Sequence, residues 1–232
     1  MNKKIIPKII VKQNIRKDAW NWWNACNKIS YGVNWAERID EKKQKKLVGK
    51  TKKHSFNFLI SYLKKLYIKE KIYRKKKEIK NIFDQYGEQI FLRMQKVTGK
   101  KIYRKNFTCF LTTFPRAPYD YQRGYVLLPI IWPKETYTRT FIHELLHFQT
   151  YAYWQKQCLK TLTEKEFENL KEALTIILNE EFMDLIIWPD KGYEIHKDLR
   201  EKLLKFWRVN RNFKKLINYG VKIYPKPIIR DQ

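Results

Sequence analysis

The stretch that decides the fold is Thr140-Phe141-Ile142-His143-Glu144-Leu145-Leu146-His147-Phe148-Gln149. Neither proline nor glycine occurs from 134 to 188, so nothing in this region opposes a helix. In a helix, side chains four residues apart lie on one face, one turn of about 5.4 Å from each other. Both imidazoles would then reach one point, while the apolar residues around them pack into the core.

Two imidazoles at this spacing are a pattern that binds Zn²⁺, and a Glu after the first His can reach a water held on the metal. The chain has only four His, and two of them are here. The alternative is a surface helix whose two His happen to be four apart. A polar stripe in an otherwise apolar helix requires a reason, however, so we predict His143 and His147 as metal ligands and Glu144 as general base.

The window from Thr140 to Gln149 resembles the extended signature of the zincin metallopeptidases: a small residue, two apolar residues, His-Glu, an apolar residue, an uncharged residue and His. The resemblance is close over these ten residues and loose over 105–205. It implies a zinc hydrolase that acts on peptide bonds. The metzincin form is absent because Tyr153 stands where a third His is required. The gluzincin form, with a downstream Glu as third ligand, remains.

Three places compete for the third ligand: Glu166, Glu172 and the pair Glu180-Glu181. Glu166 completes a capping box with Thr163, which predicts a helix start. If the active helix ends near 157 and an antiparallel helix starts near 163, the chain returns level with the metal after 10–12 residues at about 1.5 Å per residue. This geometry favours Glu172, and Glu180 would overshoot by about 12 Å.

Two observations keep the alternatives open. Asn179-Glu180-x-x-x-Asp184 is similar to the NExxxD pattern of gluzincins, in which the Asp orients a ligand His. Glu172 has Ile176 four residues on and therefore departs from that form. A buried Glu172 carboxylate also needs a cation or a donor, for which Arg200 is the alternative to a metal.

Gluzincins commonly use a downstream His or Tyr to donate a hydrogen bond to the oxyanion. By this resemblance, Tyr193 and His196 are further catalytic candidates. They follow the break Trp188-Pro-Asp-Lys-Gly192 and precede an expected last helix from 196 to 219. The helix dipole would favour the neutral form of His196. A capping or packing His is the alternative.

The net charge is +27, from 50 Lys and Arg against 23 Asp and Glu. The excess is concentrated in 42–106, which holds 22 basic and 4 acidic residues. Such a field attracts nucleic acid, anionic membranes or acidic proteins. The alternative is a solvated lysine surface produced by coding bias, since Lys outnumbers Arg and no base-reading motif is present.

The three cysteines, Cys26, Cys109 and Cys158, form no CxxC pair, so neither a disulfide framework nor a Cys zinc site is indicated. Charge interrupts the first residues too early for a signal peptide. The uncharged stretch from 125 to 133 is too short to span a bilayer. We therefore expect a cytoplasmic protein without a membrane span.

The expected fold class is α+β and zincin-like, mainly helical with a small antiparallel sheet ahead of the active-site helix. We expect a basic, Trp-rich segment over 1–55 with a lysine-rich linker at 41–54, and a metallopeptidase domain over 56–232. Helices are predicted over 56–67 and 78–97 with Gly99 as a stop. Strands are predicted over 107–114 and 125–132, the second placed at a sheet edge by Pro129.

Trp20, Trp22, Trp23 and Trp35 are expected to dock the first 40 residues on the core; base stacking is the alternative. The sequence thus predicts a zinc-dependent peptidase acting on a peptide or protein substrate. The rival hypothesis is a non-catalytic, basic nucleic-acid-binding module with a structural or vestigial zinc site.

Overall fold

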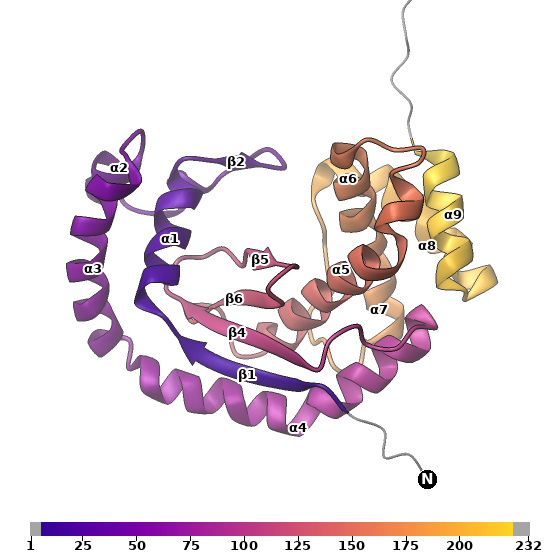
Figure 1. The fold of residues 1–232 in the computed structure, drawn as a ribbon, viewed down its shortest axis with the longest axis horizontal. Coiled ribbons are helices and arrows are strands. Elements are labelled where there is room, and N and C mark those ends of the chain that lie inside the picture. Colours follow the sequence, from indigo (N-terminus) through magenta and orange to yellow (C-terminus); the bar gives the residue numbers. More distant parts are fainter. Residues whose placement is uncertain (1–5, 225–232) are drawn as a thin grey trace, which may run out of the picture. The chain divides into compact units, whose positions relative to one another are not determined.

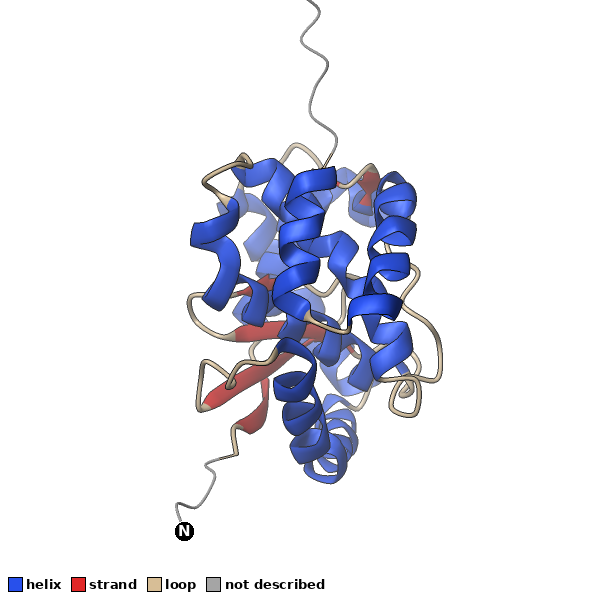
Figure 2. Cartoon of the chain, turned by 90° about the vertical axis from the view of Figure 1, so that its right-hand side faces the viewer, coloured by secondary structure: helices blue, strands red, loops and turns tan. Residues whose placement is uncertain are grey.

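The computed structural model describes residues 6–224, which divide into two compact units. Of the described residues, unit 1 comprises 6–91 and 104–144, and unit 2 comprises 92–103 and 145–224. Helices make up most of the described chain and strands are few (Figure 2). The expected α+β class is therefore confirmed.

Unit 1 contains a small sheet and several helices (Figure 1). Its elements are β1 (Lys8–Gln13), α1 (Ile15–Cys26), β2 (Ile29–Ser30), β3 (Val33–Asn34), η1 (Trp35–Arg38), α2 (Glu41–Leu47), α3 (Lys52–Lys69), most of α4 (Ile72–Thr98), β4 (Asn106–Thr112), β5 (Tyr119–Asp120), β6 (Tyr125–Pro129) and the first residues of α5 (Thr136–Cys158).

The four-stranded sheet has the order β1-β4-β6-β5. The expected antiparallel arrangement is wrong for most of it: β4 is parallel to both β1 and β6, and only β5 runs antiparallel to β6. After β4 ends, the long connection 113–124 carries the chain back to the end of the sheet where β4 begins. Strand β6 can therefore run parallel to β4, which a tight hairpin would not allow. The continuous apolar run of β6, in which only Tyr125 is not fully buried, suits a strand covered on both faces.

Two expectations about strands need correction. Pro129 does not place β6 at an edge, because β6 lies between β4 and β5 and the proline is its last residue. The ladder continues past it, where the amide of Ile130 donates to the carbonyl of Thr112 at 2.9 Å. Strand β1 was not predicted; it is the sheet edge opposite β5.

Three of the four N-terminal tryptophans join the core of unit 1, as expected: Trp22 is buried, and Trp23 and Trp35 pack against its cluster. The Trp22 ring lies edge-on to Phe114 and Tyr62, and its indole N–H donates to Thr113 Oγ1 at 2.9 Å. The division at residue 55 is wrong, because β1 shares a sheet with β4 and α1 packs with α3 inside one unit. The expected linker at 41–54 is also partly helical, as α2.

A buried carboxylate ties α1 to the end of β4. Asp18 is fully buried and accepts hydrogen bonds from Thr112 Oγ1, Thr113 N and Thr113 Oγ1 at 2.6–3.0 Å. Burial raises the pKa of Asp18 to about 6, although these hydrogen bonds act in the opposite direction.

Both predicted helices of the middle region are present as α3 and α4, and Gly99 follows α4 with φ +65. Phenylalanines of α4 pack on β4 and on the start of α5. The ring centroid of Phe91 lies 5.7 Å from that of Phe107, and Phe83 and Phe91 lie 5.2 and 6.0 Å from Phe141. These contacts hold the first turns of α5 on the sheet side of unit 1.

Unit 2 is helical. It contains the rest of α5, then α6 (Glu164–Leu174), η2 (Thr175–Ile177), α7 (Leu178–Glu181), η3 (Glu194–His196), α8 (Lys197–Asn210) and α9 (Phe213–Ile223). The single last helix expected over 196–219 is two helices, because Arg211 adopts a left-handed conformation with φ 44 and ends α8.

Candidate metal centre

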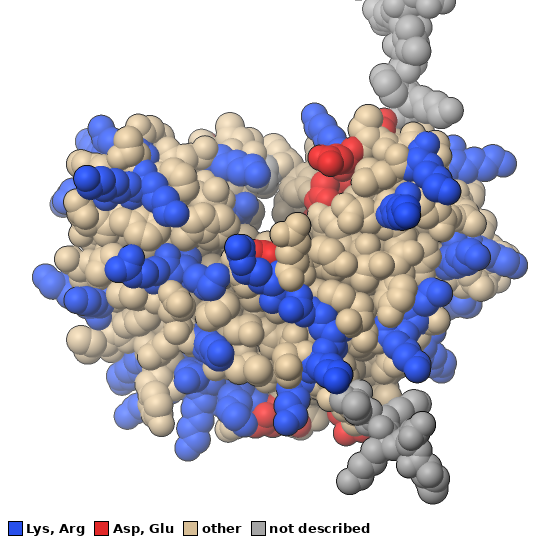
Figure 3. Space-filling model, viewed as in Figure 1, with Lys and Arg blue, Asp and Glu red and all other residues tan. Residues whose placement is uncertain are grey.

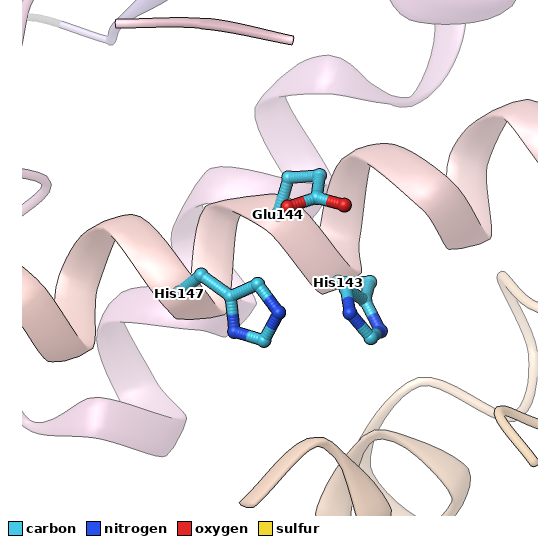
Figure 4. A group of neighbouring side chains, drawn as sticks. All are labelled: His143, Glu144 and His147. Atoms are coloured by element: carbon cyan, nitrogen blue, oxygen red, sulfur yellow. The ribbon is translucent and has the colours of Figure 1, made fainter. Parts of the chain in front are cut away.

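His143, Glu144 and His147 form a cluster on α5 that could hold a metal ion. One ligand atom from each lies within 4.8 Å of the others. The helix runs unbroken from Thr136 to Cys158, so the spacing of the two imidazoles is set by helical geometry. Both rings project from the same side of the helix (Figure 4). His147 is 1% exposed and Glu144 is 6% exposed, whereas His143 is half-buried.

Helix α6 brings Glu172 to His147. Thr163 and Glu166 form the predicted capping box, which starts α6 after a five-residue connection from α5. The chain then returns alongside α5, and Glu172 Oε1 lies 3.2 Å from His147 Nε2. Both side chains are buried. The expected start of α6, the role of Glu166 and the return distance to Glu172 are all met by the structure.

The rival acidic residues are engaged elsewhere in unit 2. Glu180 Oε1 accepts from Arg208 at 2.7 Å, and Arg211 pairs with both Glu180 and Glu181. Asp184 pairs with Arg93. The Asn179-Glu180-x-x-x-Asp184 pattern therefore has structural partners, and the structure favours Glu172 over Glu180 as the acid nearest to His147.

Lys171 is a buried residue of this site that the sequence reasoning missed. Its side chain is 1% exposed, and its Nζ lies 3.2 Å from both Glu172 Oε1 and Glu168 Oε2. Tyr151 donates a hydrogen bond to Glu168, and the ammonium lies 5.4 Å from the centroid of the Tyr151 ring. The buried Glu172 carboxylate thus has an internal cation, and it is Lys171 rather than Arg200, the alternative to a metal that the sequence offers.

Arg200 acts on the backbone of Glu172 instead of its carboxylate. Its guanidinium donates to the Glu172 carbonyl at 3.3 Å and to Thr175 Oγ1 at 2.7 Å, and it pairs with Asp190 at 2.9 Å. Thr175 also donates to the Glu172 carbonyl. These hydrogen bonds lie where α6 ends, at Leu174, and the chain continues as the 3-10 turn η2 before α7.

The absence of a side chain at Gly192 leaves room for the Arg200 guanidinium. Its φ is +65, and a Cβ added there would lie 2.6 Å from Arg200 Cζ. The break expected at 188–192 is therefore present, and its glycine is required both by conformation and by contact with Arg200.

Tyr193 and His196 lie beside α6, one turn before Glu172. His196 Nε2 is 3.3 Å from Asn169 Oδ1, and the Tyr193 ring is edge-on to the imidazole. Burial lowers the pKa of His196; the Glu172 carboxylate raises it, and the charges of Arg200 and Lys171 lower it. The imidazole is therefore mainly neutral at pH 7, for which burial, and not the helix dipole we expected, is the main cause.

The basic side chains are spread widely over the displayed face of the molecule (Figure 3). They do not gather in one strip of that face. This spread is the distribution that a solvated lysine surface predicts. Binding of nucleic acid or an acidic partner through 42–106 stays a prediction. No helix within residues 6–224 combines the length and apolarity needed to cross a bilayer.

Comparisons with protein-family models, with curated proteins and with solved structures give no match for this chain.

Proposed function

We propose that this chain is a zinc-dependent peptidase of the gluzincin kind. His143, His147 and Glu172 would hold the ion, and Glu144 would act as general base. The observation that carries the proposal is the 3.2 Å approach of Glu172 to His147, whose helix presents a second imidazole one turn earlier. Two imidazole nitrogens and one carboxylate are a common ligand set of catalytic zinc.

The donor set fits zinc better than a hard oxygen-seeking cation. Imidazole nitrogen suits zinc and its neighbours among the transition metals, whereas Mg²⁺ and Ca²⁺ take oxygen ligands. Burial of His147, Glu144 and Glu172 provides a water-poor environment, in which electrostatic interactions are stronger.

Zinc bound there would lower the pKa of a bound water to about 7 and polarise the scissile carbonyl. Glu144 accepts the proton of the attacking water and delivers it to the leaving amine. Its position directly after His143 places its carboxylate beside the two imidazoles, as required of such a base. Neutral His196 would donate a hydrogen bond to the developing oxyanion, in line with the expected role of this residue.

The short strand β5 is the sheet edge that we propose for substrate binding. It pairs with β6 on one side only, through Tyr119 and Asp120. An extended peptide can add to such an edge by main-chain hydrogen bonds.

Metal content tests the proposal most directly. Purified protein should contain one zinc per chain, and His147→Ala should contain almost none. His54→Ala is the matched control, because it removes an exposed imidazole from α3. Zinc retained by His147→Ala, or lost equally from both variants, would rule out the site.

A further inference from the structure

Lys171 lies between two carboxylates at the centre of a network that links α5 to α6. The network runs from His147 to Glu172, Lys171, Glu168 and Tyr151. Its two ends, His147 and Tyr151, lie one turn apart on α5. Lys171 is the most deeply buried of the ion-paired lysines in the described part of the chain, with its side chain 1% exposed. Lysine is almost never fully buried unless it is paired, so this placement requires a specific cause.

The Glu172 carboxylate has a counter-charge inside the protein, although Lys171 shares its ammonium between Glu172 and Glu168. The ammonium of Lys171 contacts the same Oε1 that lies 3.2 Å from His147 Nε2. A divalent ion bound by this oxygen would stand close to the ammonium, and like charges at such distances repel strongly in a buried site. Glu168, 33% exposed, offsets part of that repulsion.

We propose that Lys171 is a built-in counter-cation of the metal site: it stabilises Glu172 in the metal-free protein and lowers the affinity for the divalent ion. This inference rests on the proposed function, because it takes Glu172 as a metal ligand. A carboxylate buried without its cation is strongly destabilising, so Lys171 allows the fold to form before metal binds. The same charge then opposes binding, which keeps the metal exchangeable.

The decisive variant is Lys171→Met, which retains an unbranched side chain and removes the charge. Its metal-free form should melt about 10 °C below the metal-free wild type, because Glu172 and Glu168 lose their cation. Its zinc Kd, measured by competition with a chelating dye, should be at least about tenfold tighter. Saturating zinc should restore most of the lost melting temperature. A zinc Kd that is unchanged or weaker would overturn the proposal.

Glu168→Gln provides a test in the opposite direction and does not require a change at a buried position. It leaves the ammonium less neutralised, so zinc should bind severalfold more weakly than in wild type. An unchanged or tighter Kd would contradict the proposal even if Lys171→Met failed to fold. Lys171→Arg, which keeps the charge, should stay near wild type in both measurements.

Lys197→Met is the matched control. It removes an exposed lysine of unit 2 whose Nζ lies 3.8 Å from Glu194. It should change neither the melting temperature nor the zinc Kd. If its effect equalled that of Lys171→Met, the changes would follow from the net charge of the protein, and the proposal for Lys171 would fail. Failure of the proposed function gives a different result: wild type and His147→Ala would then have the same zinc content.

Discussion

Glu172 Oε1 lies 3.2 Å from His147 Nε2, although the two residues belong to different helices and are separated by a turn. Helix lengths account for much of this contact: α5 continues eleven residues past His147, and Glu172 lies eight residues into α6, which returns alongside it after a five-residue connection. The capping box at Thr163 fixes where the return begins.

Glu172→Gln should therefore weaken zinc binding by more than about 100-fold, since even residues that only orient a ligand cost 10–100-fold. The Kd can be measured by dye competition. Glu180→Gln is the control, because Glu180 pairs with Arg208 and Arg211. If Glu180→Gln weakened zinc binding as much as Glu172→Gln does, or more, Glu172 would not be the third ligand.

Glu144→Gln should leave zinc content unchanged while peptide hydrolysis falls by about 10²–10⁴, the usual contribution of a general base. The change preserves shape and removes only the ability to accept the proton. Glu164→Gln, at an exposed position in the first turn of α6, should retain full activity. Activity retained by Glu144→Gln would remove Glu144 from its proposed role.

His196→Phe should lower kcat by about 10²-fold and leave KM nearly unchanged, because an oxyanion donor acts in the transition state. The phenyl ring preserves packing against Tyr193, whereas His196→Gln keeps a donor and should recover part of kcat. A fall in thermal stability with kcat unaffected in the folded fraction would assign His196 to packing.

Asp18 should make the free energy of unfolding depend on pH. Its folded-state pKa is about 6, above the ordinary value of 3.8, so the native protein binds the proton more tightly. The corresponding stability is present below about pH 4 and lost as pH rises through 6, by about 2–3 kcal/mol. In Asp18→Asn, the free energy of unfolding, measured by denaturation at several pH values, should change less across this window. Asp198→Asn, at an exposed position, should keep the wild-type slope.

Gly192→Ala should lower the free energy of unfolding by about 2–3 kcal/mol and weaken zinc binding. The new Cβ would strain a positive φ and displace the Arg200 guanidinium, which holds the Glu172 carbonyl. Gly49→Ala is the matched control, because it shares the positive φ but meets nothing within 4 Å. It should cost about 1 kcal/mol and leave zinc binding unchanged. Equal effects in the two variants would remove Arg200 from the explanation.

The candidate site was more predictable than the sheet. Helical periodicity and the Thr163 capping box are local signals, and together they placed Glu172 near His147. The parallel pairing of β1 with β4 depends on residues far apart along the chain, which no local pattern records. The apolar run of β6 does indicate a strand buried on both faces, a signal compatible with parallel neighbours.

Other features escaped prediction because they arise only from tertiary contacts. Where α6 ends, Thr175 and Arg200 both donate to the carbonyl of Glu172, and Arg200 lies well beyond the helix in sequence. Lys171 carries a charge, and nothing in the sequence around it indicates that it is buried. Its burial becomes intelligible only when Glu168 and Glu172 are seen on either side.

Strand β1 imposes an order on the biosynthesis of this protein. A ribosome releases Lys8–Gln13 long before it has made its partner Asn106–Thr112, a delay on the order of 5–20 s at ordinary rates of elongation. During that interval, the nascent strand has an open edge that invites wrong partners. Its exposed lysines, Lys8 and Lys12, place charge along that edge, and thus serve as gatekeepers against premature association.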